Sequence, residues 1–313
     1  MTLDQNYDVV IIGGGMAGLS TALVLGRARR RVVVLDAGNP RNAPAGHVHG
    51  YPTRDGTAPA RLLELARAEV RSYGVQVLDG SATGISPEGA VRLADGRLLH
   101  GRQVVLAAGL KDVLPPIGGI DSRWGRDVLQ CPYCHGWEVA DRRLAVLGTS
   151  ESSLHQALLV ATFSSDVVLL LDPAIEPDVD QQDSLAAMGV EVVGGRAASL
   201  ATSNDALSAV VLDDGRSVPC DALFCEPGAS VDQALVAGLE VDSDGCVRTD
   251  AQGHTGKGRI WAVGNVCDPS AQVVAAAGDG YRLAVAVNAA LLDEDVLLAR
   301  SRRSAARTTA RTR

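Results

Sequence analysis

The chain has 313 residues, 46% of them hydrophobic, and a formal net charge of −8 at pH 7. This length exceeds the usual size of a single hydrophobic core and predicts two domains. The acidic balance argues against nucleic acid as a partner, because a phosphate backbone requires a concentrated basic face.

Neither a membrane span nor an export signal is visible in the sequence. No segment has the roughly 18 consecutive apolar residues that a spanning helix requires, and the apolar run at 9–12 lacks the basic flank and cleavage site of a signal peptide. The six cysteines are irregularly spaced, which does not suggest a disulfide framework. These features predict a soluble, cytoplasmic protein without a membrane partner.

The first predicted elements are a strand, a glycine turn and a helix. An apolar, β-branched run at 7–12 leads to Gly13, Gly15 and Gly18, and a helical stretch of small residues follows at 19–27. In this G-x-G-x-x-G spacing the missing side chains permit a tight turn, close approach of a pyrophosphate and close packing of the helix. The pattern predicts a dinucleotide-binding loop; the alternative is a glycine-rich turn in an unrelated α/β domain.

A second predicted strand, residues 31–35, ends at Asp36. An acidic residue about twenty positions after such a loop can accept hydrogen bonds from a ribose hydroxyl. Asp36 therefore supports dinucleotide binding, although the glycine loop alone does not distinguish FAD from NAD.

The most distinctive motif is Cys131-Pro132-Tyr133-Cys134-His135-Gly136. Two cysteines separated by two residues can close a small disulfide ring, and a helix N-terminus can stabilise one of them as a thiolate. The pair is therefore predicted to be a redox switch. The alternatives are half of a zinc site or two buried thiols; zinc would require a second ligand pair, so no metal is predicted. The other cysteines are interpreted as ordinary thiols: Cys220, Cys225, Cys246 and Cys267.

The chain ends in an arginine-rich segment. From about residue 300 the arginines stand among Ser, Ala and Thr without an acidic residue, a pattern typical of a solvated end. We therefore predict that the tail is disordered from about residue 300.

Two further segments resemble the FAD signatures of flavoproteins with two dinucleotide-binding domains. Residues 104–109 resemble the short strand and turn near the end of the first FAD segment. Residues 260–266 resemble the second signature, which delivers a polar residue to the ribityl-phosphate region of the flavin. Asn265 stands where most members carry Asp and can still hydrogen-bond there. Gln272 precedes a small-residue stretch, 273–280, that fits a helix beginning beside the isoalloxazine ring.

Together these motifs resemble the low-molecular-weight thioredoxin reductase family, from Tyr7 to about Leu292. The resemblance implies an α/β fold with two Rossmann-like dinucleotide-binding domains, FAD as the cofactor and a homodimer. It implies a discontinuous FAD-binding domain at 1–116 and 243–313. An inserted, degenerate NADPH-binding-like domain at 117–242 carries the cysteine pair.

A loop that in this family runs close to the flavin contains His47 and His49. The resemblance therefore predicts His49 as a cofactor-binding residue, and one of the two histidines could instead serve as a second base. The complete predicted set of FAD-binding residues is Gly13, Gly15, Gly18, Asp36, His49, Asn265 and Gln272.

The inserted domain departs from the family at its nicotinamide site. A predicted strand at 143–147 leads into 148–153, where only Gly148 keeps a glycine and Glu151 adds negative charge where a pyrophosphate would bind. Reductases carry a His-Arg-Arg cluster after the next strand to hold the 2′-phosphate of NADPH, but here residues 172–177 contain acids and prolines. NADPH is therefore not expected to be the physiological electron source.

The redox motif also departs from the reductases, which place Asp after the second cysteine where this chain has His135. The sequence Cys-Pro-Tyr-Cys-His-Gly-Trp-Glu resembles FAD-dependent dithiol oxidases of the gliotoxin and holomycin type, which close disulfides in natural products and return electrons to oxygen. The resemblance implies that Cys131 exchanges with substrate and that Cys134 lies nearer the flavin. His135 is the candidate base; its alternative role is a helix-start histidine bonded to backbone.

We therefore predict an FAD-dependent dithiol oxidase whose partners are a small-molecule dithiol and molecular oxygen, with hydrogen peroxide as product. Potentials of such cysteine pairs span about 150 mV, so the pair alone does not fix the direction of electron flow. Two alternatives stay open. One is a thioredoxin-type disulfide reductase that uses NADPH or a protein electron donor. The other is a non-catalytic flavoprotein that senses redox state or binds a dithiol.

Overall fold

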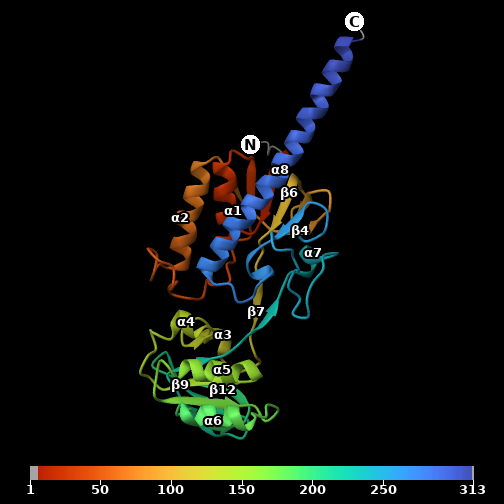
Figure 1. Cartoon of the computed structure of the whole chain (residues 1–313). Helices are drawn as coiled ribbons and strands as arrows, with labels where there is room; N and C mark the ends of the chain where they lie inside the picture. Colours follow the sequence, from red (N-terminus) through yellow and green to blue (C-terminus); the bar gives the residue numbers. More distant parts are fainter. Residues whose placement is uncertain (1–5, 312–313) are drawn as a thin grey trace. The chain divides into compact units, whose positions relative to one another are not determined.

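The computed structural model describes residues 6–311, and the chain divides into two compact units (Figure 1). The first unit takes the described residues of 1–41, 60–111 and 229–313, and the second takes 42–59 and 112–228. The observed divisions after 111 and 228 differ from the predicted domain boundaries after 116 and 242.

Segment 42–59, which the sequence analysis assigned to the FAD-binding domain, groups with the second unit instead. Its Pro44 packs directly on Gly125, where an added Cβ would lie 2.7 Å from the Pro44 carbonyl oxygen. His49 of the same segment also lies close to Glu138, with Nε2 3.4 Å from Glu138 Oε1. These contacts join residues that are far apart in sequence, so no local pattern could have predicted them.

The first unit contains a seven-stranded sheet. The parallel strands follow the order β3-β2-β1-β6, with β17 also beside β6, and β5 and β4 continue as an antiparallel edge. The strands are β1 (Asn6–Ile12), β2 (Val32–Asp36), β3 (Gln76–Asp79), β4 (Ala82–Ile85), β5 (Ala90–Leu93), β6 (Leu98–Leu106) and β17 (Ile260–Ala262). Residues Val9, Val10 and Ile11 are fully buried, as expected for a parallel strand covered on both faces.

Figure 1 shows the first unit's long helices side by side, and one buried apolar cluster unites them with β1 and β2. The helices of this unit are α1 (Met16–Arg27), α2 (Pro59–Ser72), α7 (Gln233–Val236), the short 3-10 helix η1 (Gly264–Val266) and α8 (Val273–Arg311). Helices α1 and α8 approach closely because of small residues: a Cβ on Gly280 would lie 2.3 Å from the Ala17 carbonyl oxygen. Thr21 Oγ1 donates to the Gly280 carbonyl across the same contact, at 3.0 Å.

The C-terminal end of α8 corrects the prediction of a disordered tail, since the helix continues to Arg311. Ala and Arg are both strong helix formers, and basic residues are favourable near a helix C-terminus. Ser301 Oγ also donates to the Leu297 carbonyl one turn back, at 3.0 Å. Within residues 6–311, neither this 39-residue helix nor any other is apolar enough over sufficient length to cross a membrane.

The second unit contains a five-stranded parallel sheet in the order β11-β10-β9-β15-β8. Its strands are β8 (Val128–Leu129), β9 (Leu144–Gly148), β10 (Val167–Leu171), β11 (Glu191–Gly194) and β15 (Ala222–Phe224). An antiparallel sheet comprises β12 (Ala197–Ser203), β13 (Ala206–Leu212) and β14 (Ser217–Pro219), and a two-stranded sheet pairs β7 (Lys111–Val113) with β16 (Gly228–Ser230). The helices are α3 (Ile120–Arg123), α4 (Pro132–His135), α5 (Glu151–Val160) and α6 (Val179–Ala187).

In each of the two sheets a central strand, β1 or β9, is followed in the chain by two parallel strands that step outward on one side, and a later strand, β6 or β15, pairs on its other side. This is the topology of dinucleotide-binding folds. The predicted fold class, α/β with two Rossmann-like units, is therefore confirmed. In such sheets ligands bind at the carboxyl ends of the strands, beside the helix that follows the first strand. In this chain those places are the turn between β1 and α1 and the turn between β9 and α5.

Candidate redox site

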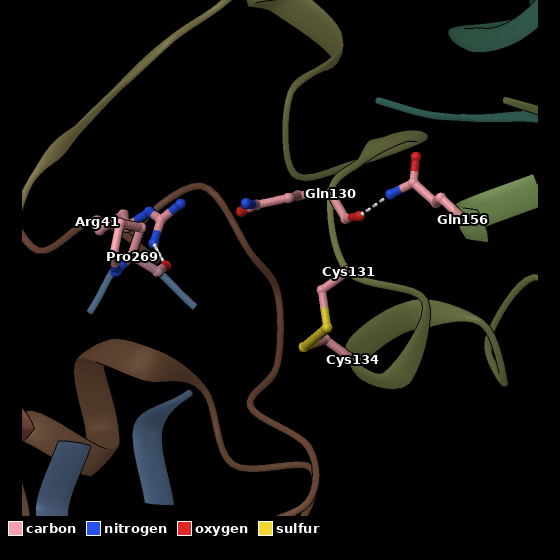
Figure 2. The surroundings of a disulfide bond; sticks show 6 residues. All are labelled: Arg41, Gln130, Cys131, Cys134, Gln156 and Pro269. Atoms are coloured by element: carbon pink, nitrogen blue, oxygen red, sulfur yellow. Dashed lines mark hydrogen bonds between the residues drawn. A yellow bond between two sulfur atoms is a disulfide. The ribbon is translucent and has the colours of Figure 1, made fainter. Parts of the chain in front are cut away.

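Cys131 and Cys134 form a disulfide in the second unit, with Cα atoms 5.2 Å apart (Figure 2). Cys131 is the N-cap of α4, and Pro132 occupies the first helical position, where its missing N–H costs nothing. The backbone N–H groups of Cys134 and His135 both donate to the Cys131 carbonyl, at 3.1 Å each. Both cysteines are half-buried, so the surrounding protein covers the pair only in part.

Contacts on both sides of α4 fix the position of this pair. Gln156 Nε2, from α5, donates to the Gln130 carbonyl at 2.8 Å, just before Cys131 (Figure 2). At the other end, a Cβ on Gly136 would lie 2.6 Å from the Pro132 carbonyl oxygen and 2.8 Å from the Phe163 ring. Only glycine therefore lets the end of α4 close against Phe163.

Substituting Gly136→Ala should lower the free energy of unfolding by about 1–3 kcal/mol, because the new methyl group overpacks this contact. Denaturant unfolding of the flavin-saturated protein measures the change. The matched control is Gly194→Ala on β11, where an added Cβ meets no described heavy atom within 4 Å. Equal stability of the two variants would show that α4 can move away from Phe163 to accept the methyl group without loss of stability.

His135, the last residue of α4, is half-buried beside the disulfide. Burial lowers the pKa of His135 below its ordinary value; the Glu138 carboxylate opposes this effect, and the charge of His49 adds to it. A lowered pKa keeps the imidazole neutral at pH 7, and a neutral imidazole can accept a proton. His135 thus directly follows Cys134 and is neutral at pH 7, and its role as the base stays a prediction.

Two carboxylates hold His49, one at each ring nitrogen. Nε2 lies 3.4 Å from Glu138 Oε1, and Nδ1 lies 3.4 Å from Asp55 Oδ2. Asp55 is itself fixed by the Gly50 backbone N–H, which donates to its Oδ1 at 2.9 Å. The sequence analysis predicted that His49 binds the cofactor, and that contact stays a prediction; the structure joins His49 to the surroundings of His135. Asp55 carried no sequence signal. Glu138 ends the motif at 131–138, but its relation to His49 is spatial and was not predicted.

The aromatic neighbours of the disulfide were also missed as functional candidates. Tyr133 is 76% exposed and Trp137 is 82% exposed, far more than large apolar side chains usually are. They stand four residues apart around the second cysteine, so the motif itself carried the signal. Exposed aromatic surface beside a reactive sulfur can pack on a planar or apolar substrate.

The dinucleotide loop of the first unit lies between β1 and α1, and its three glycines have distinct roles. A Cβ on Gly13, whose φ is 112°, would lie 2.1 Å from the Ala107 carbonyl oxygen, and one on Gly18 would lie 2.1 Å from the Gly13 carbonyl oxygen. These two permit the turn and the helix packing. A Cβ on Gly15 would meet no heavy atom of the described chain within 4 Å, so open space lies before α1.

This open space fits a pyrophosphate. Gly15 is the N-cap of α1, and no side chain among the described residues makes a capping hydrogen bond there. The first N–H groups of the helix can therefore bind an anion, with the helix dipole in favour. The residues present thus fit a dinucleotide such as FAD, as the glycine spacing predicted.

Asp36 ends β2 beside this loop, where a Cβ on Gly14 would lie 2.3 Å from the carboxylate. Its Oδ1 accepts from the Gly38 N–H at 2.9 Å, and its Oδ2 accepts from Arg67 of α2 at 2.5 Å. Arg67 was missed by the sequence analysis, because nothing in α2 marks one arginine among several. The ion pair holds Asp36 against the loop, and carboxylate lone pairs remain for a ribose hydroxyl.

Asn265 and Gln272 bracket the loop before α8. Asn265 Nδ2 donates to the carbonyls of Asp268 and Ala271 at 2.9 and 3.0 Å and lies 3.3 Å from that of Pro269. Arg41 also donates to the Pro269 carbonyl at 2.7 Å (Figure 2). Asn265 thus fixes this loop with donors that Asp lacks, and its contact with the flavin stays a prediction. Gln272 immediately precedes the first residue of α8, as predicted.

These features define a class of protein: a thioredoxin reductase-like α/β oxidoreductase with a dinucleotide loop in one unit and a cysteine pair in the other. The chain belongs to the pyridine nucleotide-disulphide oxidoreductase family, whose model matches residues 7–280. Members of this family are flavoproteins.

Similar proteins cover nearly the whole chain. The thioredoxin reductase sirT of Leptosphaeria maculans is 31% identical over 97% of this chain and 99% of its own length. The crystal structure of HlmI is 44% identical, covers 99% of both chains and has a TM-score of 0.90. An oxidoreductase from Agrobacterium tumefaciens is 36% identical over 92% of this chain and 99% of its own, with a TM-score of 0.85. The predicted resemblance to thioredoxin reductases is therefore confirmed.

Proposed function

We propose that this chain is an FAD-dependent dithiol oxidase that closes an intramolecular disulfide in a small natural-product dithiol. The observation that carries the proposal is the half-buried Cys131–Cys134 disulfide beside His135, whose pKa is lowered by burial. An oxidised cysteine pair is an electron acceptor, and a neutral imidazole is the base that a thiol substrate requires.

The chemistry at the pair is two successive thiol–disulfide exchanges. A substrate thiol loses its proton to His135, and the thiolate attacks Cys131 Sγ, which breaks the protein disulfide and releases the Cys134 thiolate. The second substrate thiolate then attacks the substrate sulfur of the mixed disulfide and releases the Cys131 thiolate. The substrate leaves as a disulfide, and its two electrons remain on the cysteine pair. One of its protons is then on His135, and the proton of its second thiol has passed to the Cys134 thiolate.

Bound FAD would accept this electron pair and pass it to molecular oxygen, which gives hydrogen peroxide. Residues proposed to hold it are those of the glycine loop with Asp36, Asn265 and Gln272. His49, between Asp55 and Glu138, is proposed to keep the loop that carries it in place near His135. Tyr133 and Trp137 are proposed to pack against the substrate.

A thioredoxin-type disulfide reductase is the second candidate, because the similar sirT protein is named a thioredoxin reductase. Two features of this chain weigh against it. His135 stands at the reductase acid position, and Glu151 begins the helix where NADPH phosphates would bind. An anaerobic titration distinguishes the two: dithiothreitol is expected to bleach the flavin, and an equal concentration of NADPH is not. Bleaching by NADPH alone would establish the reductase.

We also propose the homodimer that the family resemblance implies. Helix α8 exposes large apolar side chains along its length that a second copy could cover: Tyr281, Val285, Leu292, Val296, Leu297 and Leu298. Light scattering of the intact protein is expected to give twice the chain mass of 32.4 kDa. A monomer at micromolar concentration would contradict this proposal without affecting the chemistry.

A further inference from the structure

The turn between β9 and α5 has the position of a second nucleotide-phosphate site. Strand β9 ends at Gly148, and the ten-residue α5 begins at Glu151. Ser150 is the N-cap, and its Oγ accepts from the Ser153 backbone N–H at 3.3 Å. In dinucleotide-binding units, the helix N-terminus after the first strand receives the pyrophosphate.

In this chain a carboxylate of the protein itself lies at that N-terminus. Glu226 Oε2 accepts from Ser150 Oγ at 3.1 Å and from Ser152 Oγ at 2.5 Å. Glu226 follows β15, the strand next to β9 in the sheet, so the fold delivers it across the turn. It is half-buried, and the hydroxyls that hold it belong to the N-cap and the first turn of α5.

The electrostatics of this arrangement oppose a bound phosphate. Glu226 brings one negative charge to the helix N-terminus, and Glu151 brings a second in the first turn. A pyrophosphate there would face both carboxylates and would have to displace Glu226 from its two hydroxyl donors. The positive charge of Arg196 near the end of β10 does not offset these two carboxylates, because Arg196 already pairs with Asp172 at 3.1 Å.

We propose that Glu226 is an internal anion that occupies the pyrophosphate position of the second unit and thereby excludes nicotinamide dinucleotides. It is a specificity-determining residue: the chain's own carboxylate accepts from the Ser150 and Ser152 hydroxyls at the helix N-terminus, so a phosphate of NADPH would meet this negative charge there. This goes beyond the proposed function, which names the electron donor, because it identifies the residue that bars the competing donor.

The test uses the full-length, FAD-saturated protein and inorganic pyrophosphate as the probe in titration calorimetry. Substituting Glu226→Ala removes both the charge and the bulk, and should lower the pyrophosphate dissociation constant at least about tenfold relative to the unsubstituted protein. The control is Glu191→Ala on β11, an acid of the same unit that pairs with Arg143, and it should leave the dissociation constant unchanged. Equal dissociation constants for all three proteins would overturn the proposal.

A second variant keeps the test valid if Glu226→Ala does not fold. Glu226→Gln keeps the shape and removes only the charge, so it should show a smaller gain in the same direction. No gain in either variant overturns the assignment. Dithiol oxidation, measured on the same samples, should be unchanged in all of them. If every sample lacks it, the proposed function fails, while the pyrophosphate comparison still decides the role of Glu226.

Discussion

Replacing Cys131 with serine is expected to reduce dithiol oxidation by at least about 10³-fold, because the substrate sulfur then has no disulfide to attack. Cys134→Ser should have an equally large effect, since neither exchange can occur with one cysteine alone. Oxygen consumption in the presence of dithiothreitol measures both variants. The flavin spectrum of each variant should be retained, because the glycine loop lies in the other unit.

The matched control for these variants is Cys267→Ser in the first unit. Burial raises the pKa of the Cys267 thiol to about 12, so at neutral pH it stays protonated and unreactive. This variant should oxidise dithiols at close to the original rate. Retained dithiol oxidation in Cys131→Ser would contradict the exchange mechanism. Dithiol binding without turnover, equal in Cys131→Ser and the unsubstituted protein, would instead support the non-catalytic flavoprotein.

Replacing His135 with asparagine has the second largest expected effect, a loss of about 10²–10⁴-fold in the rate of cysteine reduction by a dithiol. The neutral imidazole is the active form, so the rate should fall as the pH falls through the pKa of His135. Burial lowers that pKa, so the fall is expected below the ordinary histidine value of about 6.5. Anaerobic stopped-flow measurements of flavin bleaching between pH 5 and 8 should show this fall, and the variant should lose it.

The Glu138→Gln variant tests whether His135 is the base, because a purely structural histidine would not change the pH at which the rate falls. The Glu138 carboxylate raises the pKa of His135 against the effect of burial, so its removal should move the acidic limb to still lower pH. A second group that acts on His135 is His49, whose electrostatic effect lowers the pKa of His135. If the asparagine variant keeps the original rate and pH profile, His135 is not the base.

Local motifs account for the part of this protein that the sequence could predict. The spacing of Gly13, Gly15 and Gly18 predicted a strand, a turn and a helix, and the structure shows why each glycine is required or free. Cys131 and Cys134 are separated by two residues, which brings their Cα atoms within disulfide range once a helix starts between them. In both cases the information lies within a few neighbouring residues.

The rest depends on contacts between distant residues, for which a single sequence has no pattern. The pairing of His49 with Glu138, and of Glu226 with Ser150 and Ser152, arises only once the strands of the second unit are in order. The prediction of a disordered tail was wrong for a different reason. Its composition suggested disorder, but Ala and Arg also favour helix, and continuation of α8 decided between them.

The central claim is that electrons enter from a small dithiol and leave to oxygen without a nicotinamide. The most direct measurement follows oxygen, hydrogen peroxide and substrate disulfide together in an NADPH-free reaction of the purified, FAD-saturated protein with dithiothreitol. Our account predicts one oxygen consumed and one peroxide formed for each disulfide closed, with no turnover in Cys131→Ser. Absence of oxygen consumption with dithiol, together with rapid flavin reduction once NADPH is added, would contradict it.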